Sequence, residues 1–143
     1  MYLILALIFI VIVAALCWFD DSLPKQYRRR VCMGRRWKQA FPAAKKQDMR
    51  RFLTDFTLAF AFDEKDKLQF APTDKILDIY RALYPKKWMP DSLEIETLAE
   101  DMAVKYQVKL EGIWYDDLTL GELYLATQPG KSAVALGHCQ LSK

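Results

Sequence analysis

The chain has 143 residues, of which 52% are hydrophobic and 27% charged, and its formal net charge is +3. This length allows one modest domain with an appendage. Residues 1–19 carry no charged side chain, whereas every Lys and Arg lies at position 25 or later. An uncharged segment of this length argues against a plain soluble protein.

The three cysteines are scattered along the chain, at Cys17, Cys32 and Cys139. They form no CxxC pair, and no histidine stands at a ligand spacing from them. The sequence therefore predicts neither a disulfide scaffold nor a metal site.

The uncharged segment predicts a membrane anchor. Residues 2–19 would extend about 27 Å as a helix, close to the bilayer core of about 30 Å, with Trp18 and Phe19 at the interface. We expect residues 1–20 to form a single-pass transmembrane helix.

Three alternatives to an anchor stay open. A cleaved signal peptide would carry positive charge ahead of a shorter apolar region. Residues 13–17 resemble a bacterial lipoprotein cleavage box, although Leu16 stands where a small residue is expected. A buried helix of a soluble protein is the third alternative. Cys17 at the membrane boundary is compatible with acylation as well as with an ordinary apolar role.

A strongly basic segment follows the uncharged one. Residues 25–51 hold eleven basic side chains and a single acid, Asp48, which gives +10, whereas residues 52–143 have a net charge of −5. Basic residues beside a membrane helix are retained in the cytoplasm, so the rest of the chain is expected there, at the inner or plasma membrane. We expect residues 21–45 to be a juxtamembrane neck that contacts anionic lipid rather than nucleic acid. Its lipid-facing side chains would be Arg28, Arg29, Arg30, Arg35 and Arg36.

The remaining chain predicts an all-α domain over residues 46–128, followed by a flexible tail over residues 129–143. An apolar stripe over residues 47–60 and another from residue 91 to Tyr106 indicate the two longest helices. Phe52, Phe56, Leu98 and Met102 are expected to be buried together, because these stripes are the only two long apolar faces.

Shorter elements are expected between and after these helices. A loop over residues 70–74 should place Thr73 or Asp74 as the cap of a short helix that starts near Ile76. Residues 85–90 should be loop, and residues 108–114 are ambiguous between a loop and a strand. Asp117 or Thr119 should cap a last helix that ends near Thr127.

Signatures of catalysis are scarce. The only histidine, His138, lies in the predicted tail, and the chain has no GxGxxG, P-loop or HExxH motif. We therefore expect that the protein is not an enzyme.

One pattern resembles a known family. Asp91-Ser92-Leu93, an acidic helix, Tyr106, Leu110 and the LTLGEL segment at residues 118–123 are similar in spacing to the second half of an acyl carrier protein. The resemblance extends more weakly to residue 46. It implies a small helical bundle in which Ser92 would carry 4'-phosphopantetheine and the acidic helix would dock basic-faced partner proteins. The residues of that docking surface would be Asp91, Glu94, Glu96, Glu100 and Asp101, with Trp88 from the preceding loop.

The chain departs from the family just before this pattern. Met89 stands where the family usually has a glycine, and residues 80–90 are an additional segment with two prolines. Ser92 is equally understandable as an unmodified helix cap. Three functions are compatible with these features. We favour an interaction module without a prosthetic group. The alternatives are a true carrier of acyl groups to membrane enzymes and an immunity-type inhibitor.

Overall fold

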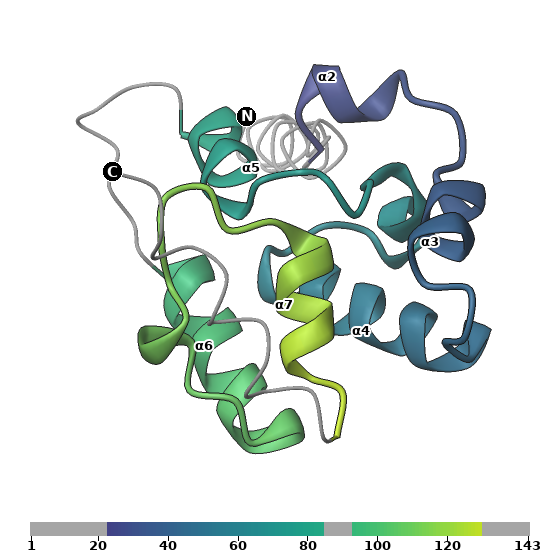
Figure 1. Cartoon of the computed structure of the whole chain (residues 1–143). Coiled ribbons are helices and arrows are strands. Elements are labelled where there is room, and N and C mark those ends of the chain that lie inside the picture. The colour runs from purple at the N-terminus through teal and green to yellow at the C-terminus, as the bar shows by residue number, and fades with distance from the viewer. Residues whose placement is uncertain (1–22, 85–92, 130–143) are drawn as a thin grey trace, which may run out of the picture.

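Helices make up the regular structure of the part of the chain that the computed structural model describes, residues 23–84 and 93–129 (Figure 1). This part contains no strand, only an isolated bridge between Lys75 and Thr119, and the all-α prediction is confirmed for it. No helix within these ranges is long and apolar enough to span a bilayer. The predicted anchor, residues 1–20, and most of the predicted tail lie outside them. The helices are α2 (Lys25–Arg28), α3 (Gly34–Ala40), α4 (Lys46–Ala59), α5 (Ile76–Leu83), α6 (Leu93–Tyr106) and α7 (Leu120–Ala126), with the 3-10 helices η1 (Glu64–Gln69) and η2 (Leu110–Gly112).

The two long helices pack against each other as predicted. α4 and α6 correspond to the two apolar stripes of the sequence, and they contact each other. Phe52 and Phe56 on α4, and Leu98 and Met102 on α6, are fully buried in one hydrophobic core. Their common burial confirms the predicted pairing of the two helices.

The expected separation between a neck and a domain is wrong. Leu23, Tyr27, Met33 and Trp37 belong to the same buried cluster as α4 and α6. Trp37 on α3 is 1% exposed, and its indole Nε1 donates a 2.8 Å hydrogen bond to the carbonyl oxygen of Phe70. The domain therefore includes residues 23–45, because their aromatic side chains cover apolar surface that α4 and α7 leave open.

The segment between α4 and α6 contains more structure than the sequence indicated. The polar residues after α4 form η1, where the Asp63 side chain accepts a hydrogen bond from the backbone N–H of Lys65. The short helix near Ile76 is confirmed as α5, but its predicted side-chain cap is wrong. Lys75 occupies the N-cap position without a side-chain hydrogen bond, and the Asp74 carboxylate accepts instead from the Ala71 N–H at 2.6 Å.

The C-terminal part of the domain forms two short elements. The ambiguous residues 108–114 contain the 3-10 turn η2 and no strand. Thr119 caps α7 in a capping box with Glu122, as predicted, whereas Asp117 pairs with Lys75 at 2.7 Å. Backbone hydrogen bonds join the start of α7 to the loop before α5, including one of 2.8 Å from the Gly121 N–H to the Pro72 carbonyl.

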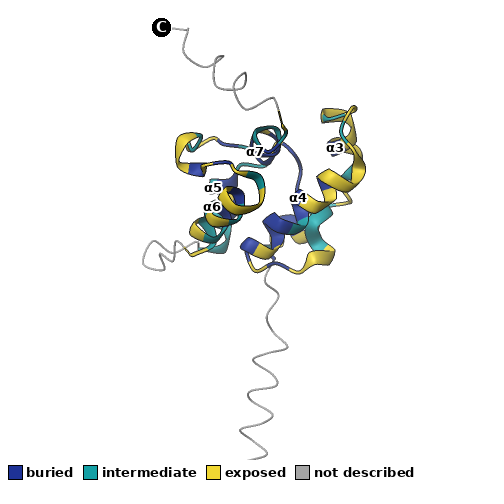
Figure 2. Ribbon diagram, turned by 90° about the horizontal axis from the view of Figure 1, so that it is seen from below, coloured by how far each residue is buried: buried dark blue, intermediate teal, exposed yellow. Residues whose placement is uncertain are grey.

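The basic helix α3 and the acidic helix α6 occupy different sides of the molecule. α3 and α6 lie on opposite sides of the domain, with α4 between them, in both views (Figures 1 and 2). The side of each helix that faces the centre is buried, and the outer sides are exposed (Figure 2). The exposed cations of α3 and the exposed carboxylates of α6 therefore lie far from each other on the domain.

Candidate functional site

The outer face of α6 is the surface that the resemblance assigned to partner binding. Leu93, Glu96, Glu100 and Val104 are all exposed, and their spacing of three or four residues places them on one stripe. The side chains of Leu93 and Val104 are 58% and 73% exposed, although both are apolar. The stripe thus has two carboxylates between two exposed apolar side chains, a combination typical of an interaction surface.

A polar cluster on the opposite side of α6 fixes how the helix is rotated on α4. Asp55 of α4 is 8% exposed and accepts hydrogen bonds from the Tyr106 hydroxyl at 2.6 Å and from the Lys105 ammonium at 2.9 Å. Lys105 also contacts Asp101 at 3.2 Å. The contacts satisfy the nearly buried carboxylate, so they hold the stripe toward solvent.

The pKa values of this cluster follow from its surroundings. Burial, together with the hydrogen bond to Asp55, raises the pKa of the Tyr106 phenol well above its usual value. The hydrogen bond to Asp55 raises the pKa of the Lys105 ammonium. Both groups are therefore protonated at neutral pH and can donate their hydrogen bonds to the Asp55 carboxylate.

Not all of the predicted docking acids share the stripe. Glu94 is partly buried and accepts a hydrogen bond from the Tyr84 hydroxyl, and Asp101 is partly buried beside Lys105. Only Glu96 and Glu100 lie fully on the outer face, so the predicted surface is narrower than the sequence indicated. Asp91, Ser92 and Trp88 lie outside the described residues.

The predicted lipid-facing arginines also divide into two groups. Arg29, Arg35 and Arg36 are exposed. Arg30 is not directed outward, since it donates a 2.6 Å hydrogen bond to Asp74 and lies 4.6 Å from the centre of the Tyr27 ring. Its guanidinium therefore holds the N-terminal segment against the loop before α5.

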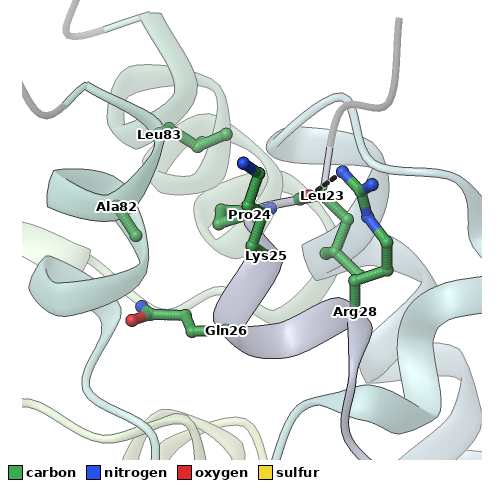
Figure 3. A pocket seen from close by; sticks show the side chains of 7 residues that line it. All are labelled: Leu23, Pro24, Lys25, Gln26, Arg28, Ala82 and Leu83. Carbon is green, nitrogen blue, oxygen red and sulfur yellow. Dashed lines mark hydrogen bonds between the residues drawn. The ribbon is translucent and has the colours of Figure 1, made fainter.

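Arg28 lies beside a shallow pocket between α2 and the end of α5. Figure 3 shows this pocket, of about 580 Å³, with Leu23, Ala82 and Leu83 among its lining residues. Arg28 donates a 3.0 Å hydrogen bond to the Leu23 carbonyl oxygen, and Lys25 extends beside Pro24 (Figure 3). Two cations thus lie next to the residue at which the predicted anchor would enter the domain.

A groove between α3 and α4 was missed by the sequence reasoning. It has a volume of about 620 Å³, and Arg35, Lys38, Lys46 and Arg50 line it together with apolar side chains. The groove was not expected because α3, which forms one of its sides, lies within residues 21–45, the predicted neck. The aromatic residues Trp37 and Phe41, four positions apart among the basic residues, were the available signal of a packed helix.

Comparison with known proteins adds no identification. No protein-family model, no curated protein and no solved structure matches the chain significantly. Within residues 23–84 and 93–129 there is also no group of three or more side chains that could hold a metal ion.

Proposed function

We propose that the protein is a membrane-anchored interaction module without catalytic activity, whose domain resembles an acyl carrier protein. The exposed stripe of α6 binds a partner protein with a basic surface at the cytoplasmic face. The observation that carries this proposal is the grouping of Leu93, Glu96, Glu100 and Val104 on the outer face of α6. Exposed apolar groups supply contact area, and the two carboxylates steer association with a basic partner.

Charge reversal on the stripe tests the proposal. The full chain carrying Glu96→Lys and Glu100→Lys should retain its fold but lose partners that co-purify with the wild-type chain from native membranes. Glu111→Lys with Asp116→Lys is the matched control, because both acids are exposed outside the stripe and the charge change is the same. Equal partner recovery from both double variants would reject the stripe as the docking surface.

The anchor is proposed from the uncharged residues 1–19 and the basic residues that follow. The full chain should stay with membranes after washing in high salt and at alkaline pH. A chain without residues 1–20 should become extractable by high salt, because only charge attraction to lipid would remain. Retention of this deletion variant under high salt would contradict a single anchor.

A covalent carrier is the second candidate. It is favoured by the sequence Asp91-Ser92-Leu93 ahead of the acidic residues of α6, a helix that packs on α4. A phosphodiester at that position would be near unpaired backbone N–H groups. Intact mass of protein from its native host should then show a phosphopantetheine increment that Ser92→Ala removes. An unmodified mass supports the interaction module.

A further inference from the structure

The groove between α3 and α4 has the composition of a docking site for an acidic helix. Its basic side chains are Arg35 and Lys38 from α3, and Lys46 and Arg50 from α4. Met49, Leu53 and Leu68 contribute apolar surface between them. No carboxylate lines the groove in the part of the chain that the structure describes. A groove of this kind is complementary to a helix face that carries both acidic and apolar side chains.

The cations of the groove are largely uncommitted within the fold. Among the described residues, no ion pair joins a carboxylate to Arg35, Lys46 or Arg50. Lys38 alone is held, because its ammonium donates a 2.8 Å hydrogen bond to the Pro42 carbonyl oxygen. Four like charges around one groove repel one another, so an anionic occupant would relieve that repulsion.

The chain itself contains a helix face of the required chemistry. The stripe of α6 has two carboxylates, Glu96 and Glu100, flanked by the exposed apolar side chains of Leu93 and Val104. It cannot reach the groove of its own molecule, because α4 lies between α3 and α6 (Figures 1 and 2). The α6 stripe of a second copy has no such restriction.

We infer that the α3–α4 groove of one copy binds the α6 stripe of a second copy, head to tail. This inference rests on the proposed function, since it names a second copy as the basic-faced partner of α6. The two contacting surfaces differ, so a bound pair still presents one free groove and one free stripe, and association continues into a ring or an open row. Anchoring in one membrane favours such contacts by raising the local concentration of the copies.

The native Cys32 provides a direct test, because it lines the groove and is exposed. The full chain is used in membranes, with Cys17→Ser and Cys139→Ser as background. Val104→Cys on the α6 stripe should then cross-link to Cys32 of another copy with a bifunctional maleimide. Leu58→Cys is the matched control, because Leu58 is 57% exposed on α4, outside the stripe. Cys32→Ser in the Val104→Cys chain controls for cross-links between two stripes.

Charge exchange makes the test specific. Lys46→Glu with Arg50→Glu, or Glu96→Lys with Glu100→Lys, should each reduce the cross-link between Cys32 and the Val104→Cys position about tenfold, because like charges then face each other. Mixing the groove variant with the stripe variant should restore the cross-link. In this mixture the groove variant keeps Cys32, and the stripe variant carries Cys32→Ser and Val104→Cys. Far-UV circular dichroism checks that these exposed substitutions leave the fold intact.

Three outcomes would overturn the inference. The first is a Val104→Cys cross-link no stronger than that of Leu58→Cys, and the second is a cross-link that survives both charge reversals. The third is the absence of a cross-link while Lys46→Glu with Arg50→Glu, in the chain without residues 1–20, abolishes flotation with anionic vesicles, which would assign the groove to lipid. If the cross-link fails but Glu96→Lys with Glu100→Lys still removes another co-purifying protein, the proposed function stands and only this inference falls.

Discussion

Tyr106 on α6 and Asp55 on α4 lie 51 positions apart in the sequence, and the Tyr106 hydroxyl donates a 2.6 Å hydrogen bond to the Asp55 carboxylate. Lys105, the residue before Tyr106, donates to the other carboxylate oxygen at 2.9 Å. Apolar packing alone permits small rotations of one helix on another. These directional bonds fix which face of α6 points to solvent, and hence where Glu96 and Glu100 lie.

The hydrogen bond between Tyr106 and Asp55 should contribute measurably to the free energy of unfolding, and Tyr124 provides a control. Tyr106→Phe should lower the free energy of unfolding by about 1.5 to 3 kcal/mol, because a bond to a charged acceptor is lost. Tyr124→Phe should change it little, since the buried Tyr124 hydroxyl has no hydrogen-bond partner among the described residues. Urea unfolding of chains without residues 1–20 compares the two. Equal losses would mean that the bond to Asp55 contributes nothing.

Alkaline pH should weaken the domain through the same tyrosine. The pKa of Tyr106 is raised in the folded state by burial and by the bond to Asp55, so its contribution is complete below the unfolded value of about 10. Above that pH the unfolded chain loses the proton first, and stability falls. The stability advantage of the wild-type chain over Tyr106→Phe should therefore narrow as the pH rises from about 10 to about 11.5. A constant difference over this range would contradict the raised pKa.

The contact between α4 and α6 should depend on Phe56. Phe56→Ala should cost about 3 to 5 kcal/mol, because the side chain is fully buried and leaves a cavity. Leu58→Ala, two positions away on the exposed side of α4, should shift stability by no more than about 0.5 kcal/mol. Thermal unfolding followed by circular dichroism at 222 nm distinguishes them. Similar melting temperatures for the two variants would place Phe56 outside the core.

Gly121 should resist replacement by alanine, although it lies in a helix. A Cβ at this position would be 2.9 Å from the Pro72 carbonyl oxygen and 3.2 Å from the Pro72 Cβ. Gly121→Ala should therefore destabilise the domain, even though alanine is favoured in helices by about 1 kcal/mol. Gly112→Ala is the control, because its Cβ would meet nothing within 4 Å. A stabilising effect of Gly121→Ala would show that α7 does not approach this loop closely.

Two truncations test whether residues 23–45 belong to the domain. Deleting residues 1–20 should leave a folded helical domain. Deleting residues 1–45 should unfold it, because Tyr27 and Trp37 are then lost from the core and one large aromatic side chain alone contributes about 3 to 5 kcal/mol. Circular dichroism and proteolysis would compare the two chains. A cooperative unfolding transition in the shorter chain would restore the neck as a separate segment.

The repeating apolar pattern made the two long helices of residues 46–128 predictable. Phe52, Phe56, Leu98 and Met102 recur at the helical period, so their burial follows from the sequence and from the lack of other long apolar faces. Thr119 was recognisable as a cap because Glu122 stands three positions later. Both signals are local, and tertiary packing strengthened them.

Residues 23–45 were misread for the opposite reason. Their dense positive charge obscured Tyr27 and Trp37, and only partners distant in sequence show what these aromatics do. Trp37 packs on Phe41, Phe52 and Tyr124, and its indole N–H donates a hydrogen bond to the Phe70 carbonyl oxygen. No local pattern specifies such a set of partners.

The sequence by itself determined the helical class, the pairing of α4 with α6, and the separation of positive charge before residue 52 from negative charge after it. Tertiary structure decided which charged side chains are exposed at the surface. Glu94, Asp101 and Arg30 became engaged by Tyr84, Lys105 and Asp74, whereas Glu96, Glu100, Arg35 and Arg50 stayed exposed. The physical reason is that helical periodicity fixes which residues share a face, but the partner that each charged side chain meets depends on elements that folding brings together from far along the chain.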